Sequence, residues 1–218
     1  MNSIAISELS TVPRKPLVVW VHGSSRADKC WPASHWLALG LRLHAAGWRV
    51  ALVHGNAAEA VASQAMADSL NAAVAANCRG RGNHAPVVEP VATVWPRMPL
   101  DALAMALAQE CGTFCYEAKS PRGGVIGVDS GISHIAVALG LPHVQLYNFD
   151  TAWRTGPLGQ PHQASVYAQP VPSVEAVWQA WLECSGGLNP DLAASDAAAA
   201  LDNPVHSSDK NATFAFTA

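Results

Sequence analysis

The sequence alternates short apolar runs with longer segments of helical periodicity. Each run has the length of one strand, and the first, 17–21, is apolar at every position, the pattern of a parallel strand covered on both faces. The runs that we identify as strands are 17–21, 49–55, 91–95, 125–128 and 143–147. Parallel neighbours need crossover connections, and the segments between the runs are long enough to supply them as right-handed helices. The sequence therefore predicts an α/β fold with a doubly wound, Rossmann-like parallel sheet.

The helices are predicted from apolar residues three or four positions apart. The expected inward stripes are Trp36, Leu39, Leu43 and Ala46 before Gly47; Val61, Ala65 and Leu70 in a helix from Glu59 to Ala73; Leu100, Leu103, Ala104 and Leu107 after Pro99; and Val174, Val177, Trp178 and Trp181 in a last helix ending near Cys184. Polar stretches at 77–84 and 111–122 are predicted to be surface loops.

One domain flanked by irregular ends is expected. A chain of 218 residues, 50% of them hydrophobic, can build one α/β domain with a substantial core but not two. Residues 1–15 are interpreted as a loose leader and 16–186 as the folded domain. Residues 187–218 are rich in Ala, Ser, Asp and Asn and offer little to bury, so a disordered tail is predicted there.

Charge and cysteine content exclude several classes of function. The net charge is −3, and no run of Lys and Arg interleaved with aromatic residues forms a nucleic-acid footprint. Neither a signal-like start nor an apolar run of roughly 20 residues is found, which favours a cytoplasmic protein with no transmembrane segment. The cysteines are scattered and odd in number, so free thiols are expected and a metal site is not: Cys30, Cys78, Cys111, Cys115 and Cys184.

The most informative local stretch is 127–140, where an apolar run stops at an acid, turns through Ser-Gly and becomes a helix. Ser130 or Ser133 can cap this helix, and Gly131 lets a ligand approach the backbone closely. The free N–H groups of the first turn and the positive end of the helix dipole make an anion site. Asp129 would repel a phosphate in direct contact, so it is predicted to accept sugar hydroxyls or to hold the turn.

A second polar stretch, with Ser24, Ser25 and Lys29, follows the first strand. In a sheet of order 3-2-1-4-5 the first and fourth strands are neighbours, and their carboxyl ends open into one crevice where ligands bind. One loop would bring hydroxyls and a cation to this crevice, and the other a helix N-terminus. Together the two loops predict a diphosphate site.

Each of these residues also has an ordinary structural interpretation. Lys29 can be a solvated surface lysine, and Ser24 and Ser25 can be plain turn residues. His134 lies in the first helical turn, where capping or packing is as good an explanation as ligand contact. Met98 fits a core position, although a thioether can also lie against a flat base.

Motif searches narrow the enzyme classes. No G-x-G-x-x-G follows the first strand and no G-x-x-x-x-G-K-[ST] is found, so neither a dinucleotide fingerprint nor a Walker loop is supported. Residues 18–23 are similar to the strand and His-Gly turn of α/β-hydrolases, which also need the elbow G-x-S-x-G. Neither Ser130 nor Ser133 has glycine at both required positions. A hydrolase is therefore the less favoured alternative.

Three stretches together resemble a known family: HGSSRADKCWPASHW at 22–36, PRMPL at 96–100 and VDSGISH at 128–134. In this order they are similar to the C-terminal, donor-binding half of the ADP-heptose-dependent lipopolysaccharide heptosyltransferases of glycosyltransferase family nine. The D-K-x-W-P segment resembles most closely the branch that adds the first heptose, heptosyltransferase I. The resemblance extends from about 17 to about 183 and implies one lobe of a two-lobed GT-B enzyme.

The resemblance also implies a donor site and a chemistry. The residues that match the family's motifs are Ser24, Ser25, Lys29, Met98, Asp129, Ser130, Gly131 and His134. Lys29 and the serines would hold the phosphates of ADP-heptose with Gly131, Asp129 would meet the heptose, Met98 would meet the adenine, and His134 would line the cleft. Transfer in this family inverts the anomeric centre without a metal or other cofactor. The implied location is cytoplasmic, at the inner membrane's cytoplasmic face.

The family's acceptor lobe, which supplies the carboxylate base, would precede residue 17, where the sequence has only the short leader. We therefore expect the donor half of a heptosyltransferase with no catalytic residue of its own. It would bind ADP or ADP-heptose, and the lipid-linked lipopolysaccharide core only together with an N-terminal lobe. The alternative is a stand-alone or remnant module that binds ADP or an ADP-sugar without catalysis. Asn148 also departs from the family, which usually has glycine there.

Overall fold

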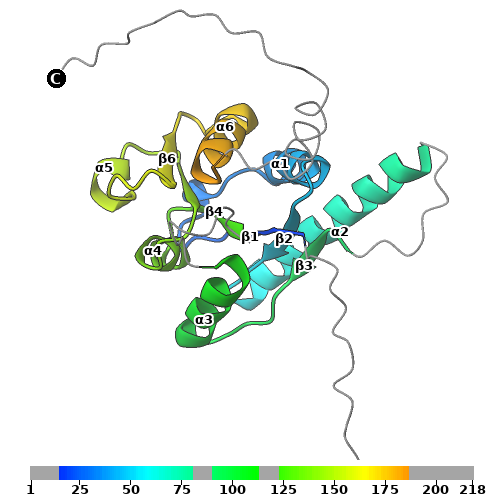
Figure 1. Ribbon diagram of the computed structural model, residues 1–218, viewed down its shortest axis with the longest axis horizontal. Coiled ribbons are helices and arrows are strands. Elements are labelled where there is room, and N and C mark those ends of the chain that lie inside the picture. The colour runs from blue at the N-terminus through cyan, green and yellow to red at the C-terminus, as the bar shows by residue number, and fades with distance from the viewer. Residues whose placement is uncertain (1–14, 81–89, 113–122, 187–218) are drawn as a thin grey trace, which may run out of the picture.

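The computed structural model describes residues 15–80, 90–112 and 123–186. The predicted disordered tail, nearly all of the predicted leader and most of the predicted loop at 111–122 lie outside the described residues. The described chain forms a six-stranded sheet in the order β3-β2-β1-β4-β5-β6, in which every neighbouring pair is parallel (Figure 1). The predicted doubly wound sheet and its order 3-2-1-4-5 are confirmed.

The elements follow one another as strand and crossover helix. The strands are β1 (Leu17–Val21), β2 (Arg49–Leu52), β3 (Ala92–Val94), β4 (Gly123–Val128), β5 (His143–Tyr147) and β6 (Gln163–Tyr167). The helices are α1 (Ala33–Ala45), α2 (Ala57–Gly80), α3 (Leu100–Cys111), α4 (Gly131–Ala138), α5 (Ala152–Thr155) and α6 (Val174–Cys184), with a short 3-10 helix η1 (Ala27–Lys29) before α1.

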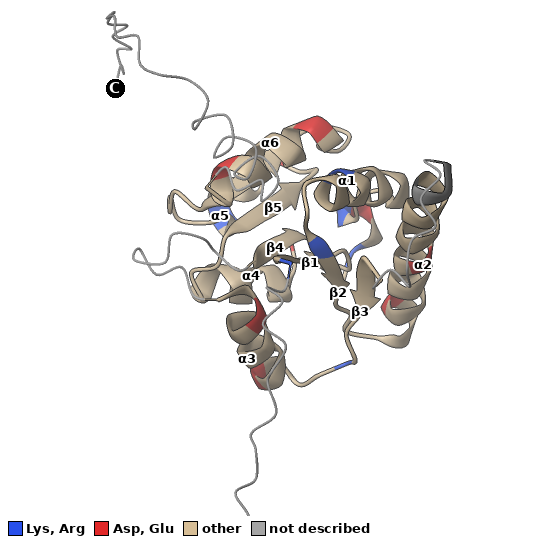
Figure 2. Ribbon diagram, turned by 45° about the vertical axis from the view of Figure 1, so that its right-hand side comes forward, with Lys and Arg blue, Asp and Glu red and all other residues tan. Residues whose placement is uncertain are grey.

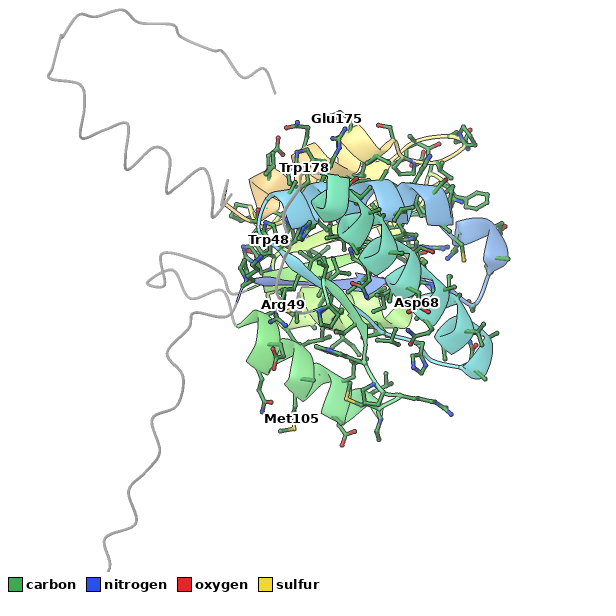
Figure 3. The ribbon with its side chains drawn as sticks, turned by 90° about the vertical axis from the view of Figure 1, so that its right-hand side faces the viewer. Trp48, Arg49, Asp68, Met105, Glu175 and Trp178 are labelled. Atoms are coloured by element: carbon green, nitrogen blue, oxygen red, sulfur yellow. The ribbon has the colours of Figure 1, made fainter. Side chains whose placement is uncertain are left out.

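Helices cover both faces of the sheet (Figure 1). One core lies between the sheet and α1, α2 and α6, and a second lies between the sheet and α3 and α4. In β1 the alternation of a strand sends Val18 and Trp20 into the first core and Val19 into the second. Figure 3 shows α3, with Met105, and α6, with Glu175, on opposite sides of the sheet.

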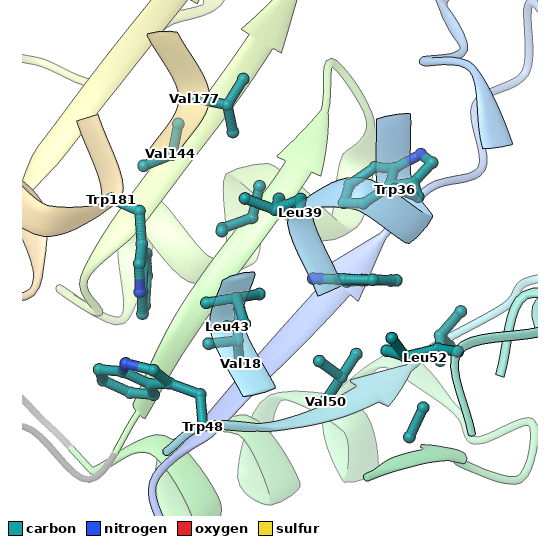
Figure 4. Close-up of a cluster of buried hydrophobic side chains, with 14 of the residues drawn as sticks. Val18, Trp36, Leu39, Leu43, Trp48, Val50, Leu52, Val144, Val177 and Trp181 are labelled. Atoms are coloured by element: carbon teal, nitrogen blue, oxygen red, sulfur yellow. The ribbon is translucent and has the colours of Figure 1, made fainter. Parts of the chain in front are cut away.

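Tryptophan dominates the first core (Figure 4). Trp20 and Trp36 lie with their ring centroids 5.0 Å apart, and Trp48 and Trp181 pack edge to face at 5.2 Å. All four rings are fully buried. Trp31 meets Trp36 edge to face at 5.0 Å, and the burial of Trp36 confirms its predicted inward position. Offset and edge-to-face ring pairs add stabilisation beyond the area that they bury.

The prediction for α2 was wrong in extent and in part of its inward face. The helix continues to Gly80, so the stretch from 77 to 80 is helical and not loop. Val61 is 72% exposed and Ala65 is also exposed, whereas Leu70 is buried as predicted. A Cβ at Gly40 of α1 would lie 2.6 Å from a methyl carbon of Leu70, so the close approach of the two helices fixes this register. An alanine-rich helix has too little periodicity to reveal it.

Other boundaries also differ from the prediction. Leu100 begins α3 and is exposed, and the buried stripe is formed by Leu103, Leu107 and Cys111. Cys111 therefore belongs to the helix and not to the loop that follows, and burial raises the pKa of its thiol to about 12.

The strands also differ from the prediction. β2 ends at Leu52, and the segment after β5 contains α5 and β6, which were not predicted. The polar, half-exposed sequence of β6 is typical of an edge strand and has no apolar run to detect.

Candidate functional site

The loop after β1 and the turn after β4 meet at the carboxyl edge of the sheet. The two strands pair in register up to Val21 and Gly127, so their following residues emerge side by side. The hydroxyl of Ser24 donates to the backbone oxygen of Asp129 at 3.2 Å, and Lys29 Nζ donates to Asp129 Oδ2 at 2.6 Å. Two polar stretches about 100 residues apart in sequence thus share one crevice, as the predicted strand order requires.

Asp129 is the centre of this polar cluster. Its side chain is 8% exposed and that of Lys29 is 21% exposed, so their ion pair is less screened than a surface pair. The other carboxylate oxygen lies 3.5 Å from Gln145 Nε2 and 3.6 Å from His134 Nε2. Charged residues are sparse, and the acidic ones lie mainly on helices (Figure 2). Asp129 is instead a buried acid at a strand end, held by a lysine.

The N-terminus of α4 opens toward the same crevice. Ser130 has the extended backbone of an N-cap, but its side chain makes no capping bond, and its buried Oγ has no partner among the described residues. Ser133 is buried and donates back to the carbonyl of Val128 at 2.6 Å. The expectation that a serine side chain caps α4 was therefore wrong. A Cβ at Gly131 would meet no atom within 4 Å, so the first residue of α4 leaves room for a ligand to approach the helix N-terminus.

A cavity of about 490 Å³ lies beside the loop after β1 and the start of α2. Ser24 and Ser25 line it together with Glu59, and Trp31 and Met66 supply apolar surface. Its size and its mixture of apolar wall with a few polar groups are typical of small-molecule sites. Ser24 therefore belongs both to this cavity and to the polar cluster around Asp129.

Sequence reasoning missed Glu59. Its Oε2 accepts a hydrogen bond from the backbone N–H of Gly55 at 2.7 Å, and its own N–H donates to Asn56 Oδ1 at 2.9 Å. Its carboxylate packs on Gly23, where a Cβ would lie only 2.5 Å from Glu59 Cδ. An acid in the first turn of a helix is normally assigned to the helix dipole. The signal available in the sequence was its position after the second strand of a doubly wound sheet.

His22 has a structural role. Its Nε2 lies 2.7 Å from the hydroxyl of Ser63, both residues are buried, and burial lowers the pKa of His22. Ser63 is fully buried in α2 and out of reach of a substrate. The bond to Ser63 ties the end of β1 to α2, and His22 also lines the cavity. Neither observation supports the hydrolase alternative.

The remaining predicted site residues do not all lie at the same place. Ser25 is exposed at the cavity, and the side chain of His134 is 45% exposed beside Asp129. Met98 is half-buried against the core under α3 and α4 and does not line the cavity. Within the described ranges we find no group of three or more metal-ligating side chains and no helix long and apolar enough to cross a membrane.

A family model described as glycosyltransferase family 9 (heptosyltransferase) matches residues 5–177. The chain belongs to glycosyltransferase family 9. Its relatives include lipopolysaccharide heptosyltransferase 1 of Pseudomonas aeruginosa, 29% identical over 148 residues, and that of Salmonella typhimurium, 28% identical over 132 residues. These matches cover 68% and 61% of this chain but only 33% and 32% of the relatives. The chain thus spans about a third of the length of the curated relatives that it matches.

Solved structures show the same fold. The structure of E. coli heptosyltransferase WaaC with ADP matches with a TM-score of 0.56 at 23% identity, covering 76% of this chain and 43% of that one. A structure of E. coli ADP-heptose lps heptosyltransferase II matches with a TM-score of 0.54 at 20% identity, covering 79% and 48%. The resemblance found in the sequence is confirmed at the level of the family and of the fold.

Proposed function

We propose that this chain binds ADP-heptose and acts as the donor-binding part of a lipopolysaccharide heptosyltransferase. The observation that carries the proposal is the meeting of Lys29, Asp129 and the open N-terminus of α4 in one crevice. A lysine and a helix N-terminus are the two standard partners of a diphosphate. Family membership and the ADP of the similar WaaC structure point to the same ligand.

Lys29 and α4 would hold the diphosphate from two sides. An ammonium group has three donors, so Lys29 can keep its bond to Asp129 and still donate to phosphate oxygens. The hydroxyl of Ser130 has no partner among the described residues and would supply a further donor. When the bond from the anomeric carbon to the phosphate breaks, negative charge grows on the diphosphate. Preorganised donors stabilise that charge without further reorganisation.

The two carboxylates would bind the sugars. Asp129, which is held by Lys29, would accept hydroxyls of the heptose. Glu59 follows β2, the position at which doubly wound nucleotide-binding sheets hold the ribose hydroxyls. One of its oxygens already accepts from Gly55 N, which orients the carboxylate at the cavity. Met98 as the adenine contact and His134 as a cleft residue stay proposals from the motif alone.

We propose that transfer also needs an acceptor lobe with a general base, from outside this chain. This proposal rests on the match to about a third of each curated relative. The acceptor would be the lipid-linked lipopolysaccharide core at the cytoplasmic face of the inner membrane. Base assistance contributes about 10²–10⁴ in rate and positioning can contribute more, so the isolated chain should transfer heptose only at background level. No metal or cofactor is proposed.

Calorimetric titration tests binding, and a transfer assay tests the division of labour. The chain should bind ADP and ADP-heptose, and should bind AMP and GDP more weakly, because AMP lacks the second phosphate and GDP carries the wrong base. Absence of ADP binding by the folded chain would remove the proposed function.

Heptose transfer to a heptose-free core is then measured with the chain alone, with an N-terminal lobe of a relative, and with the lobe alone. Clear turnover by the chain alone would contradict the need for an acceptor lobe. Binding that no added lobe converts into turnover would favour the binding-module alternative.

A further inference from the structure

The segment that carries Lys29 has little support of its own. It is the short helix η1, and none of its residues is buried. On one side the chain is held where Ser24 donates to Asp129 O, and on the other where Trp31 Nε1 donates to the carbonyl of Pro172 at 2.8 Å. Between these two points the position of the Lys29 backbone must be set by other contacts.

Two residues that directly follow β5 supply these contacts. Asn148 Nδ2 donates a hydrogen bond to the backbone oxygen of Asp28, the residue before Lys29. Phe149 presents its ring to Arg26, whose guanidinium carbon lies 5.3 Å from the ring centroid. Arg26 in turn binds both carboxylate oxygens of Asp28, at 3.0 and 2.5 Å. Arg26 is thus engaged with η1 and the β5–α5 segment.

The base of this arrangement is rigid. β5 is hydrogen-bonded on both sides, to β4 and to β6, and its pairing with β6 continues to Tyr147, the residue before Asn148. The hydroxyl of Tyr147 also lies 3.2 Å from the hydroxyl of Thr155 in α5. Asn148 and Phe149 therefore project from a fixed strand end toward a segment with few contacts of its own.

We propose that Asn148 and Phe149 form a clasp on η1 that positions Lys29 for the donor's phosphates. This inference rests on the proposed binding of ADP. A lysine side chain is long and loses much rotamer freedom when it is fixed, so its contribution depends on how well its backbone is held. The clasp fixes the peptide group before Lys29, and the ion pair with Asp129 then fixes the ammonium end. Asn148 and Phe149 are positioning residues that do not touch the donor.

A double-mutant cycle with Lys29 tests whether the clasp acts through this side chain. Asn148→Ala and Phe149→Leu should each weaken ADP binding about three- to tenfold by titration calorimetry, a range typical of one lost hydrogen bond or cation–π contact. Phe149→Tyr keeps the aromatic face and should restore wild-type affinity. In a Lys29→Ala background, titrated at higher concentration, Asn148→Ala and Phe149→Leu should cause no further loss. Equal losses in both backgrounds would overturn the proposal.

Hydrogen exchange tests the clasp without ADP. Peptides that cover residues 24–31 should exchange faster in Asn148→Ala and Phe149→Leu than in wild type. The matched control is Trp153→Ala, since Trp153 lies in the same β5–α5 region, is 80% exposed and donates its indole N–H to the nearby carbonyl of Asp150 at 3.2 Å. This control should change neither exchange nor affinity. If exchange is unchanged in both variants, Asn148 and Phe149 do not hold η1 and the proposal is overturned. If exchange is faster but the wild-type protein does not bind ADP, the clasp on η1 is retained and only its role in binding is rejected.

Discussion

Two regions of the molecule differ in how far they exclude water. One is the carboxyl edge of β1 and β4, and the other is the tryptophan core between the sheet and α1, α2 and α6. The edge keeps Lys29 and Asp129 partly accessible, with a 2.6 Å ion pair and an open helix N-terminus beside it. The core buries four indole rings completely, in a tilted pair at 5.0 Å and an edge-to-face pair at 5.2 Å. Both regions stand on the same central strand, which sends Trp20 into the core and continues into the loop of Lys29.

The difference separates stability from binding. Aromatic burial removes a large apolar area from water and sets the free energy of unfolding. A half-buried ion pair gains little net stability, because desolvation offsets much of the Coulomb attraction. Substitutions in the core should therefore lower stability and leave the ADP affinity of the folded protein unchanged. Substitutions at the edge should lower ADP affinity and change stability less. Measuring the free energy of unfolding and the ADP affinity of the same variants tests whether stability and binding depend on different regions.

Trp181→Ala should lower the free energy of unfolding by about 3–5 kcal/mol, the usual cost of truncating a buried aromatic residue. Trp181 is fully buried, pairs with Trp48 and lies on α6, far from the crevice in sequence and in its contacts. Urea denaturation measures the loss, with the exposed Trp153→Ala as the control expected within about 0.5 kcal/mol of wild type. A small loss at Trp181 would show that this core is not the main source of stability.

Gly131→Val should reduce ADP affinity by about a hundredfold or more, about 3 kcal/mol, and leave the fold intact. The branched side chain would fill the space over the first turn of α4, where a Cβ meets no protein atom. The backbone at Gly131 is not left-handed, so strain is not expected. Calorimetry and a thermal melt decide the point. Normal ADP binding by the folded variant would place the phosphates elsewhere.

Acid should destabilise the core through His143. Burial lowers the pKa of His143 to about 4, from an ordinary value of 6.5, so the folded state stays neutral where the unfolded state takes up a proton. Stability from this residue is complete above pH 6.5 and is lost as pH falls toward 4, by roughly 3 kcal/mol in the limit. Denaturation at a series of pH values measures it. His143→Gln should flatten the slope in this window, and an unchanged slope would assign it to other groups.

Lys29→Ala should weaken ADP binding by about 1.5–3 kcal/mol, the range for a hydrogen bond to a charged group. Its effect on the free energy of unfolding should be smaller, because Gln145 Nε2 remains 3.5 Å from the carboxylate of Asp129 when Lys29 is removed. Calorimetry and denaturation of the same variant compare the two effects directly. If Lys29→Ala and wild type bind ADP with equal affinity, Lys29 is not part of the site. If the loss in free energy of unfolding exceeds the loss in binding free energy, Lys29 is a structural residue.

The sequence by itself determined the sheet and the place of its site. The apolar run 17–21 has no solvent-facing alternation, which is the pattern of a parallel strand covered on both faces. In the usual doubly wound order 3-2-1-4-5, which the structure has, the ends of the first and fourth strands lie together. The residues in those two loops were therefore predictable, and so was the family, because its motifs lie in them.

Only the tertiary structure decided how these residues are held. The register of α2 depends on Leu70 meeting Gly40 of another helix, because an alanine-rich helix carries almost no periodic signal. The contact of Glu59 with Gly23, the bond of Lys29 to Asp129 and the clasp of Asn148 on Asp28 each join segments 36 to 120 residues apart in sequence. Local patterns record propensity and burial, whereas a polar contact between distant segments depends on where the folded backbone places both partners. The sequence therefore determined which edge of the sheet carries the candidate site, and packing decided which side chains are fixed there.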